Sequence, residues 1–162
     1  MRLARLILAA LCLLALSAST ATAAKPERQP LELGDFDFAA GDVCSFAVHV
    51  EFLVNREKMT TFYDREGDVT RVLTTGSLVV RLSPVDDPDR TTTLNISGPS
   101  HQVFRADGSS TLTYAGRSIS LYPPGTLVFT AGRAIVELDT AGAFVSVTNI
   151  GFETDLCPML AP

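Results

Sequence analysis

The chain has 162 residues, of which 46% are hydrophobic and 19% are charged, and its formal net charge at pH 7 is −5. This length fits one domain. The negative charge repels nucleic acid and anionic membrane surfaces, and it favours solubility and attraction to a cationic partner.

The first 23 residues have the layout of a secretory signal peptide. Arg2 and Arg5 are basic, the apolar run over residues 6–18 is short for a bilayer span, and Ala21–Ala23 supplies small residues for cleavage. The sequence predicts cleavage after Ala23, with Ala24 as the neighbouring alternative and an uncleaved anchor helix as the other interpretation. Cleavage would leave 11 basic and 18 acidic side chains, a net charge of −7. We expect a protein that is secreted or held in the cell-envelope space, with no stable membrane anchor.

Residues 24–42 begin with a polar, proline-bearing stretch, "KPERQP", and continue with "LELGDFDF". The first part is expected to be a flexible leader, and the second is expected to form an edge strand or to lie over a sheet. Residues 43–162 are then expected to form a single β domain.

Two cysteines remain after cleavage, Cys44 at the start of this domain and Cys157 close to its end. An even number of cysteines in an exported chain indicates a disulfide. The bridge would close a loop of 112 intervening residues, and so would fasten the C-terminal tail to the first core strand. Redox chemistry, which favours closely spaced cysteines, and intermolecular pairing are the alternatives.

Turn signals recur through the domain at intervals of 7 to 11 residues, and the segments between them alternate apolar and polar side chains. Glycine permits the positive φ angles that tight hairpin turns need. This pattern predicts an all-β fold, an antiparallel meander of about ten strands that forms a barrel-like or strongly curled sandwich domain. The turns lie at Gly67, Gly76, Asp87, Gly98, Gly108, Gly116, Gly125, Gly132, Gly142 and Gly151.

Several stretches resemble a group of small secreted proteins of actinobacteria. They are "TTTLNISGP", "FRADGSSTLTYAGRSISLYPPG", "LVFTAGRAIVEL" and the terminal "DLCPMLA". The resemblance spans most of the chain after residue 23 and rests on turns and a cysteine pair. It implies export from a high-GC bacterium and a bridge between the early and late cysteines, and it implies no catalytic activity.

Candidate catalytic residues are few. His49 and His101 are far apart in the sequence, and both are expected at the surface. The cluster "VDDPDR" brings Asp86, Asp87 and Asp89 together, but it lacks the glycine and late glutamate of a calcium loop, and Asp-Pro turns are common. The motifs of serine hydrolases, phosphate loops and zinc sites are missing from the sequence.

We therefore expect no catalytic residue, no metal and no cofactor, and a secreted domain that binds an apolar small molecule or a protein partner. A small β-barrel enzyme of isomerase or cyclase type and a structural role in the envelope are the alternatives. The proline-stiffened loop Leu121–Leu127 could either recognise a partner or form a tight corner. A large pocket lined by Phe and Leu would favour binding or catalysis, and a perturbed ionisable group inside it would favour catalysis.

Overall fold

The computed structural model describes residues 25–161, which form eleven β-strands and one short helix. In chain order these are β1 Glu27–Pro30, β2 Phe36–Phe38, β3 Val48–Asn55, β4 Lys58–Tyr63, β5 Val69–Thr75, β6 Leu78–Pro84, β7 Thr92–Asn95, β8 Ser100–Phe104, β9 Ser110–Ser120, β10 Val128–Leu138, β11 Phe144–Asp155 and α2 Cys157–Leu160.

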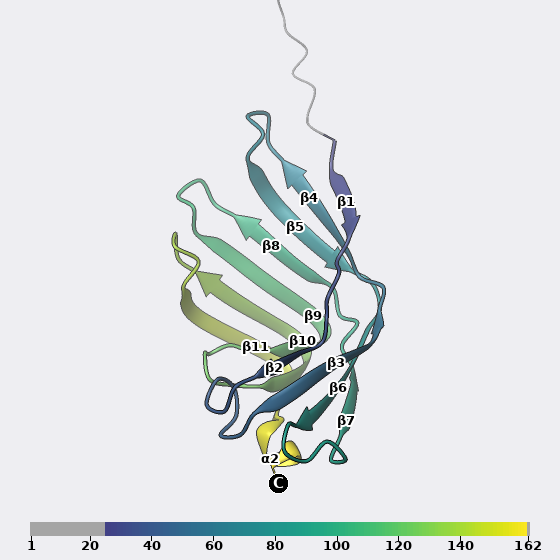
Figure 1. Cartoon of the computed structure of the whole chain (residues 1–162). Coiled ribbons are helices and arrows are strands. Elements are labelled where there is room, and N and C mark those ends of the chain that lie inside the picture. Colours follow the sequence, from purple (N-terminus) through teal and green to yellow (C-terminus); the bar gives the residue numbers. More distant parts are fainter. Residues whose placement is uncertain (1–24, 162) are drawn as a thin grey trace, which may run out of the picture.

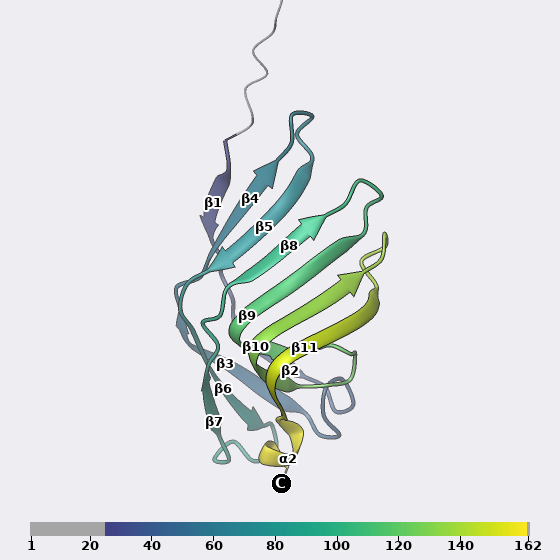
Figure 2. The same cartoon turned by 180° about the vertical axis from the view of Figure 1, so that it is seen from behind.

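The strands form two antiparallel sheets, which confirms the all-β prediction. The larger sheet has the order β1-β4-β5-β8-β9-β10-β11, and the smaller has the order β2-β3-β6-β7 (Figures 1 and 2). Within the described residues these sheets do not close into a barrel, and the strands do not form one meander. The chain leaves the larger sheet after β5 to add β6 and β7 to the smaller one, and then returns as β8.

Two short strands lie in residues 24–42. β1 pairs with β4 at one edge of the larger sheet, and β2 pairs with β3 at one edge of the smaller sheet. The start of this segment, expected as a flexible leader, therefore joins one sheet, and its second part is an edge strand of the other.

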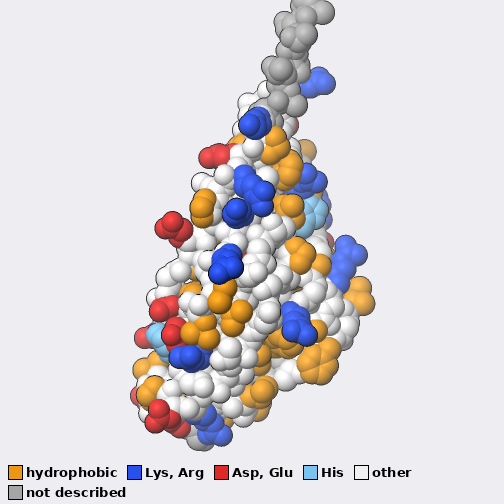
Figure 3. Space-filling view, turned by 90° about the vertical axis from the view of Figure 1, so that its right-hand side faces the viewer, with side chains coloured by type: hydrophobic (Ala, Val, Ile, Leu, Met, Phe, Trp, Pro, Cys, Tyr) orange, Lys and Arg blue, Asp and Glu red, His pale blue; other side chains and the backbone are white. Residues whose placement is uncertain are grey.

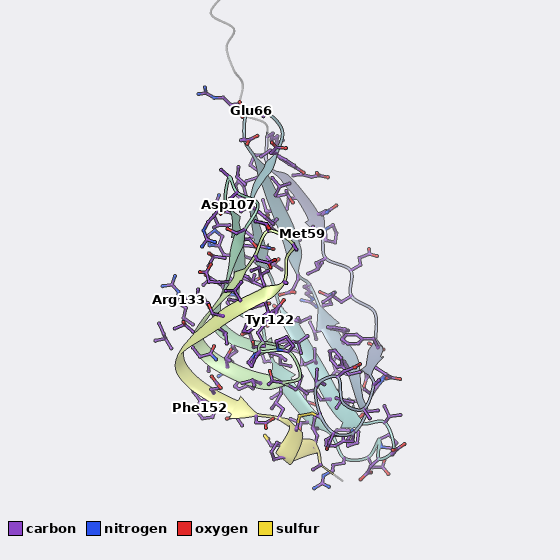
Figure 4. The ribbon with its side chains drawn as sticks, turned by 90° about the vertical axis from the view of Figure 1, so that its left-hand side faces the viewer. Met59, Glu66, Asp107, Tyr122, Arg133 and Phe152 are labelled. Atoms are coloured by element: carbon purple, nitrogen blue, oxygen red, sulfur yellow. A yellow bond between two sulfur atoms is a disulfide. The ribbon has the colours of Figure 1, made fainter. Side chains whose placement is uncertain are left out.

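A row of glycines crosses the three longest strands. Gly132 in β10 is in register with Gly116 in β9 and with Gly151 in β11, and all three have positive φ angles. At this row β11 bends sharply (Figure 4). A Cβ atom at Gly132 would collide with the backbone oxygen of Ile150, and one at Gly151 would lie 2.5 Å from the backbone oxygen of Ala131. Only glycine at these two positions permits β10 and β11 to approach each other this closely.

The main core lies on the inner face of the smaller sheet. Val48, Val50, Val80 and Leu82 alternate inward from β3 and β6 and are each 5% exposed or less. Leu127 and the tail residues Leu156 and Leu160 complete this cluster, which the lower ends of β9 and β10 also contact through Ile119 and Phe129.

The predicted bridge between Cys44 and Cys157 is present, with the two Cα atoms 5.5 Å apart. Cys44 is itself 6% exposed, and the bridge leads directly into the helix that carries Leu160. The C-terminal tail is thus fastened to the core by a covalent bond and by two buried leucines.

Candidate functional site

A hollow of about 210 Å³ lies inside the molecule between β9 and the strands β6 and β7. Five polar residues converge on it from β5, β8 and β9 and from the turn before β4. They share the lining with apolar side chains from β6 and from the segment after β7. The polar set is Glu57, Thr74, Ser100, Tyr114 and Ser118.

A second, wider hollow of about 690 Å³ opens at the surface between residues 30–33 and 55–58. Both hollows are lined by Leu31 and Glu57, so these two residues lie between the interior and the outside. The exposed Arg56 and Lys58 flank Glu57 at the outer mouth. Basic side chains are spaced along this side of the molecule, on which β1 lies, with hydrophobic side chains between them (Figure 3).

Within residues 25–161, Glu57 is the only carboxylate that lines the inner hollow. The residue is 8% exposed, and none of the three ion pairs among residues 25–161 includes it. Burial raises the pKa of the Glu57 carboxyl above its ordinary value, because removal from water disfavours the charged form. The group can therefore hold a proton at a higher pH than a surface glutamate.

We expect Glu57→Gln to stabilise the protein at neutral pH. The folded protein binds the Glu57 proton more tightly than the unfolded chain does, so the contribution of Glu57 to stability falls as the pH rises from 4.5 through the raised pKa. Urea unfolding of both proteins at pH 4 and pH 7 measures the difference. The stabilisation by Glu57→Gln should be larger at pH 7 than at pH 4. A difference in unfolding free energy that does not change with pH contradicts the raised pKa of Glu57. Glu66→Gln, at an exposed turn, is the matched control.

Aromatic side chains form the wall of the concave side of the larger sheet. The rings of Tyr122 and Phe144 stack with their centroids 5.6 Å apart, and burial raises the pKa of Tyr114 to about 12. Near them, the hydroxyl groups of Ser118 and Thr130 are hydrogen-bonded at 2.8 Å. Aromatic rings and paired hydroxyl groups therefore line this concave side.

The loop Leu121–Leu127 is exposed at Leu121 and at residues 123–125, and its end is buried. Tyr122 lies on the inner side of the bent sheet (Figure 4), and Leu127 is 1% exposed. Thr126 Oγ1 donates to the backbone oxygen of Pro123 at 2.6 Å, which closes the loop on itself. The loop thus has the closed geometry of a corner, and with its exposed prolines the recognition interpretation stays a prediction.

The convex side carries a shallow groove of about 540 Å³. Arg71 and Arg133 lie along it, and Arg71 also stacks over the ring of Phe62 at 3.8 Å. His101 lies between them, and its Nε2 atom is buried without a hydrogen-bond partner in the described part of the chain. Arg133 points away from the concave side (Figure 4).

The strand β11 forms one edge of the larger sheet and pairs only with β10 in residues 25–161. Three of its large apolar side chains, Val145, Ile150 and Phe152, are 59%, 59% and 62% exposed. Phe152 lies on the outer side of the bend (Figure 4). A long sheet edge beside exposed apolar side chains is a surface to which another strand can pair.

The two histidines lie in different sheets. His49 is on β3 of the smaller sheet, and His101 is on β8 of the larger one. Sequence spacing could not reveal that Asp37 lies beside His49, because β2 pairs with β3 across an irregular loop. Asp86, Asp87 and Asp89 form no group of metal-binding geometry, and residues 25–161 contain no such group of three side chains.

Of the sequence-predicted positions, Cys44 and Cys157 are joined, and Ala23 lies outside the described residues. In the described part of the chain, no helix has the length and apolar character needed to cross a bilayer.

Comparison with known proteins identifies no family for this chain. No protein-family model matches the chain, no curated protein matches it, and no solved structure matches it.

Proposed function

We propose that this protein is an exported binding domain, and that it binds an extended segment of a partner protein along the edge of β11. We describe the domain as a strongly curled sandwich whose larger sheet extends beyond the smaller one. The single observation that carries the proposal is the length of the β11 edge combined with its exposed side chains.

The four sheet edges differ greatly in length. β1, β2 and β7 have four, three and four residues, whereas β11 has 12. Natural sheets usually protect a long edge with lysine, proline or a covering loop. The stretch 144–152, "FVSVTNIGF", has no charged residue and no proline. This edge therefore offers main-chain hydrogen bonds to a partner strand.

Charge favours a partner over a second copy of this chain. Glu153 and Asp155 follow the uncharged stretch and are exposed, and the chain after residue 23 has a net charge of −7. Two copies would repel each other, whereas a segment with apolar side chains and a Lys or Arg opposite Glu153 would be attracted.

The interior supports a small-molecule ligand less well. Small-molecule sites usually occupy about 300–1,000 Å³, and the inner hollow, at about 210 Å³, is smaller than this and is lined by polar and apolar side chains together. The small volume of the inner hollow also gives little support to an isomerase or cyclase, because such an enzyme must enclose its substrate. A structural role in the envelope would not require an exposed apolar edge.

The test is a selection of displayed 12-residue peptides on the purified protein. We expect enrichment of segments that alternate apolar residues and carry a basic residue near one end. Amide hydrogen exchange should then show protection along β11 when a selected peptide is bound. Replacement of both Ile150 and Phe152 by serine should weaken binding at least about tenfold, because two exposed apolar anchors are lost.

Val103→Ser is the matched control, since Val103 is 38% exposed but lies on β8, an internal strand. It should bind like the unchanged protein. Selected peptides that protect other strands, or that bind the double serine variant equally well, refute the proposal. A concentration-dependent dimer that pairs β11 with β11 would replace the partner by a second copy, and native mass spectrometry would detect it.

A further inference from the structure

The smaller sheet places a serine, a histidine and an aspartate side by side in one row. Asp37 on β2 is the register partner of His49 on β3, and His49 is the register partner of Ser83 on β6. Directly opposite residues of antiparallel strands project from the same face, with Cβ atoms about 4.5–5.5 Å apart. The three side chains therefore stand together on the outer face, opposite the face that carries Val48 and Val50.

The hydrogen bond within this row joins His49 to Asp37, and in the described part of the chain Ser83 Oγ is placed beside His49 by register alone, without a hydrogen bond to it. His49 Nδ1 lies 2.5 Å from Asp37 Oδ1. Because an ionised carboxylate can only accept, Nδ1 donates its proton to Asp37, and Nε2 is then the basic nitrogen of the neutral ring. A hollow of about 180 Å³ is lined by all three residues and walled by Pro84, Val85 and Pro88.

We propose that Ser83, His49 and Asp37 form a site for acyl transfer from small activated esters, independent of the β11 edge. Ser83 is the nucleophile, His49 the general base, and Asp37 the positioning residue that fixes the ring and its tautomer. Ser83 is 5% exposed, so only a short acyl group fits above it. The side chains of His49 and Asp37 are 40% and 57% exposed, which leaves the leaving group in water.

Each step conserves atoms and electrons. Ser83 Oγ bonds to the ester carbonyl carbon while its proton passes to His49 Nε2 and the carbonyl electron pair moves to oxygen. The tetrahedral intermediate collapses, the bond to the leaving oxygen breaks, and that oxygen takes the proton from Nε2. Water then attacks the acyl carbon and gives a proton to Nε2, the bond to Ser83 Oγ breaks, and Oγ recovers the proton as the carboxylic acid departs.

The wall of the hollow restricts the substrate to esters with good leaving groups. The backbone N–H of Val85 already donates to Ala47 and that of Asp87 to Pro84, so neither is available to stabilise an oxyanion. Without such donors attack on an amide carbonyl would be very slow, whereas aryl esters and thioesters have a more electrophilic carbonyl carbon and a better leaving group.

The test uses p-nitrophenyl acetate and the intact protein. We expect release of nitrophenolate with acetyl transfer to Ser83, located by peptide mass mapping. Ser83→Ala should abolish the adduct, and His49→Gln should slow acylation about 100-fold, the usual contribution of a general base. Asp37→Asn should slow acylation, and Asp37→Glu should restore part of the rate, which a merely structural role would not require.

His101→Gln and Ser146→Ala are matched controls on the other sheet and should react at the unchanged rate. Acetylation of other residues, or a rate that survives Ser83→Ala, overturns the proposal. So does a Ser83 adduct that forms equally fast in His49→Gln. A small fluorophosphonate provides a second readout, since it should label Ser83 only when His49 is intact.

Discussion

Replacement of both Cys44 and Cys157 by alanine is expected to lower the free energy of unfolding by about 4 kcal/mol. The bridge closes a loop of 112 intervening residues, and a cross-link of this span removes much conformational freedom from the unfolded chain. The measurement is urea unfolding of the double variant and of the unchanged protein at the same pH.

Reduction of the unchanged protein is the matched control for this variant. If the constraint on the unfolded chain is the cause, the reduced protein should lose about as much stability as the alanine variant. Limited proteolysis should also reach the C-terminal tail sooner, because Leu156 and Leu160 alone would then hold it. A loss below about 1 kcal/mol in both proteins would contradict this role of the bridge.

Gly132→Ala is expected to cost about 3 kcal/mol or to prevent folding. Its φ angle is +145°, and an added Cβ atom would meet the backbone of Ile150 and of Gly151 on the neighbouring strand. Neither strand can retreat without breaking the ladder between β10 and β11, so strain and steric collision add. Thermal unfolding followed by far-ultraviolet circular dichroism measures the effect.

Gly125→Ala separates backbone strain from steric collision as causes of the loss of stability. Gly125 also has a positive φ angle, +83°, but nothing lies within 4 Å of an added Cβ atom. It should therefore cost only about 1 kcal/mol, the strain of the backbone conformation alone. Equal losses in the two variants would show that close approach of the strands at Gly132 is unimportant.

The glycine turns and the alternating apolar residues were sufficient to predict an antiparallel all-β fold. The alternation in residues 45–52 reports which side chains of β3 face the core, since side chains of a strand project alternately to its two faces. The division into two sheets could not be predicted, because pairing depends on contacts between strands that are far apart in the chain. β1 pairs with β4, and β5 pairs with β8, although other segments lie between them in the chain and nothing in their local sequence identifies the partner strand.

For the candidate sites too, the sequence predicts local structure but not which strands are neighbours. The sequence places Ile150 and Phe152 on a strand, but it does not reveal that this strand lies at an edge, so their exposure could not be predicted. His49 was expected at the surface and is half-exposed there, whereas the pairing of β2 with β3 and of β3 with β6 brings Asp37 and Ser83 to its sides. The burial of Glu57 likewise depends on the packing of β6, β7 and β9 around it.

The sequence by itself determined the strand-forming character of the chain, most of its turns and the pair of cysteines, because these depend on local backbone preferences and on a count of thiols. Tertiary structure alone decided which strands are neighbours, which edge stays open and which polar groups meet. These properties depend on how the strands pair and pack at a distance, and the glycine row at Gly116, Gly132 and Gly151 shows the difference. Each glycine was read from the sequence as a turn, whereas in the fold all three lie in adjacent strands and permit one shared bend.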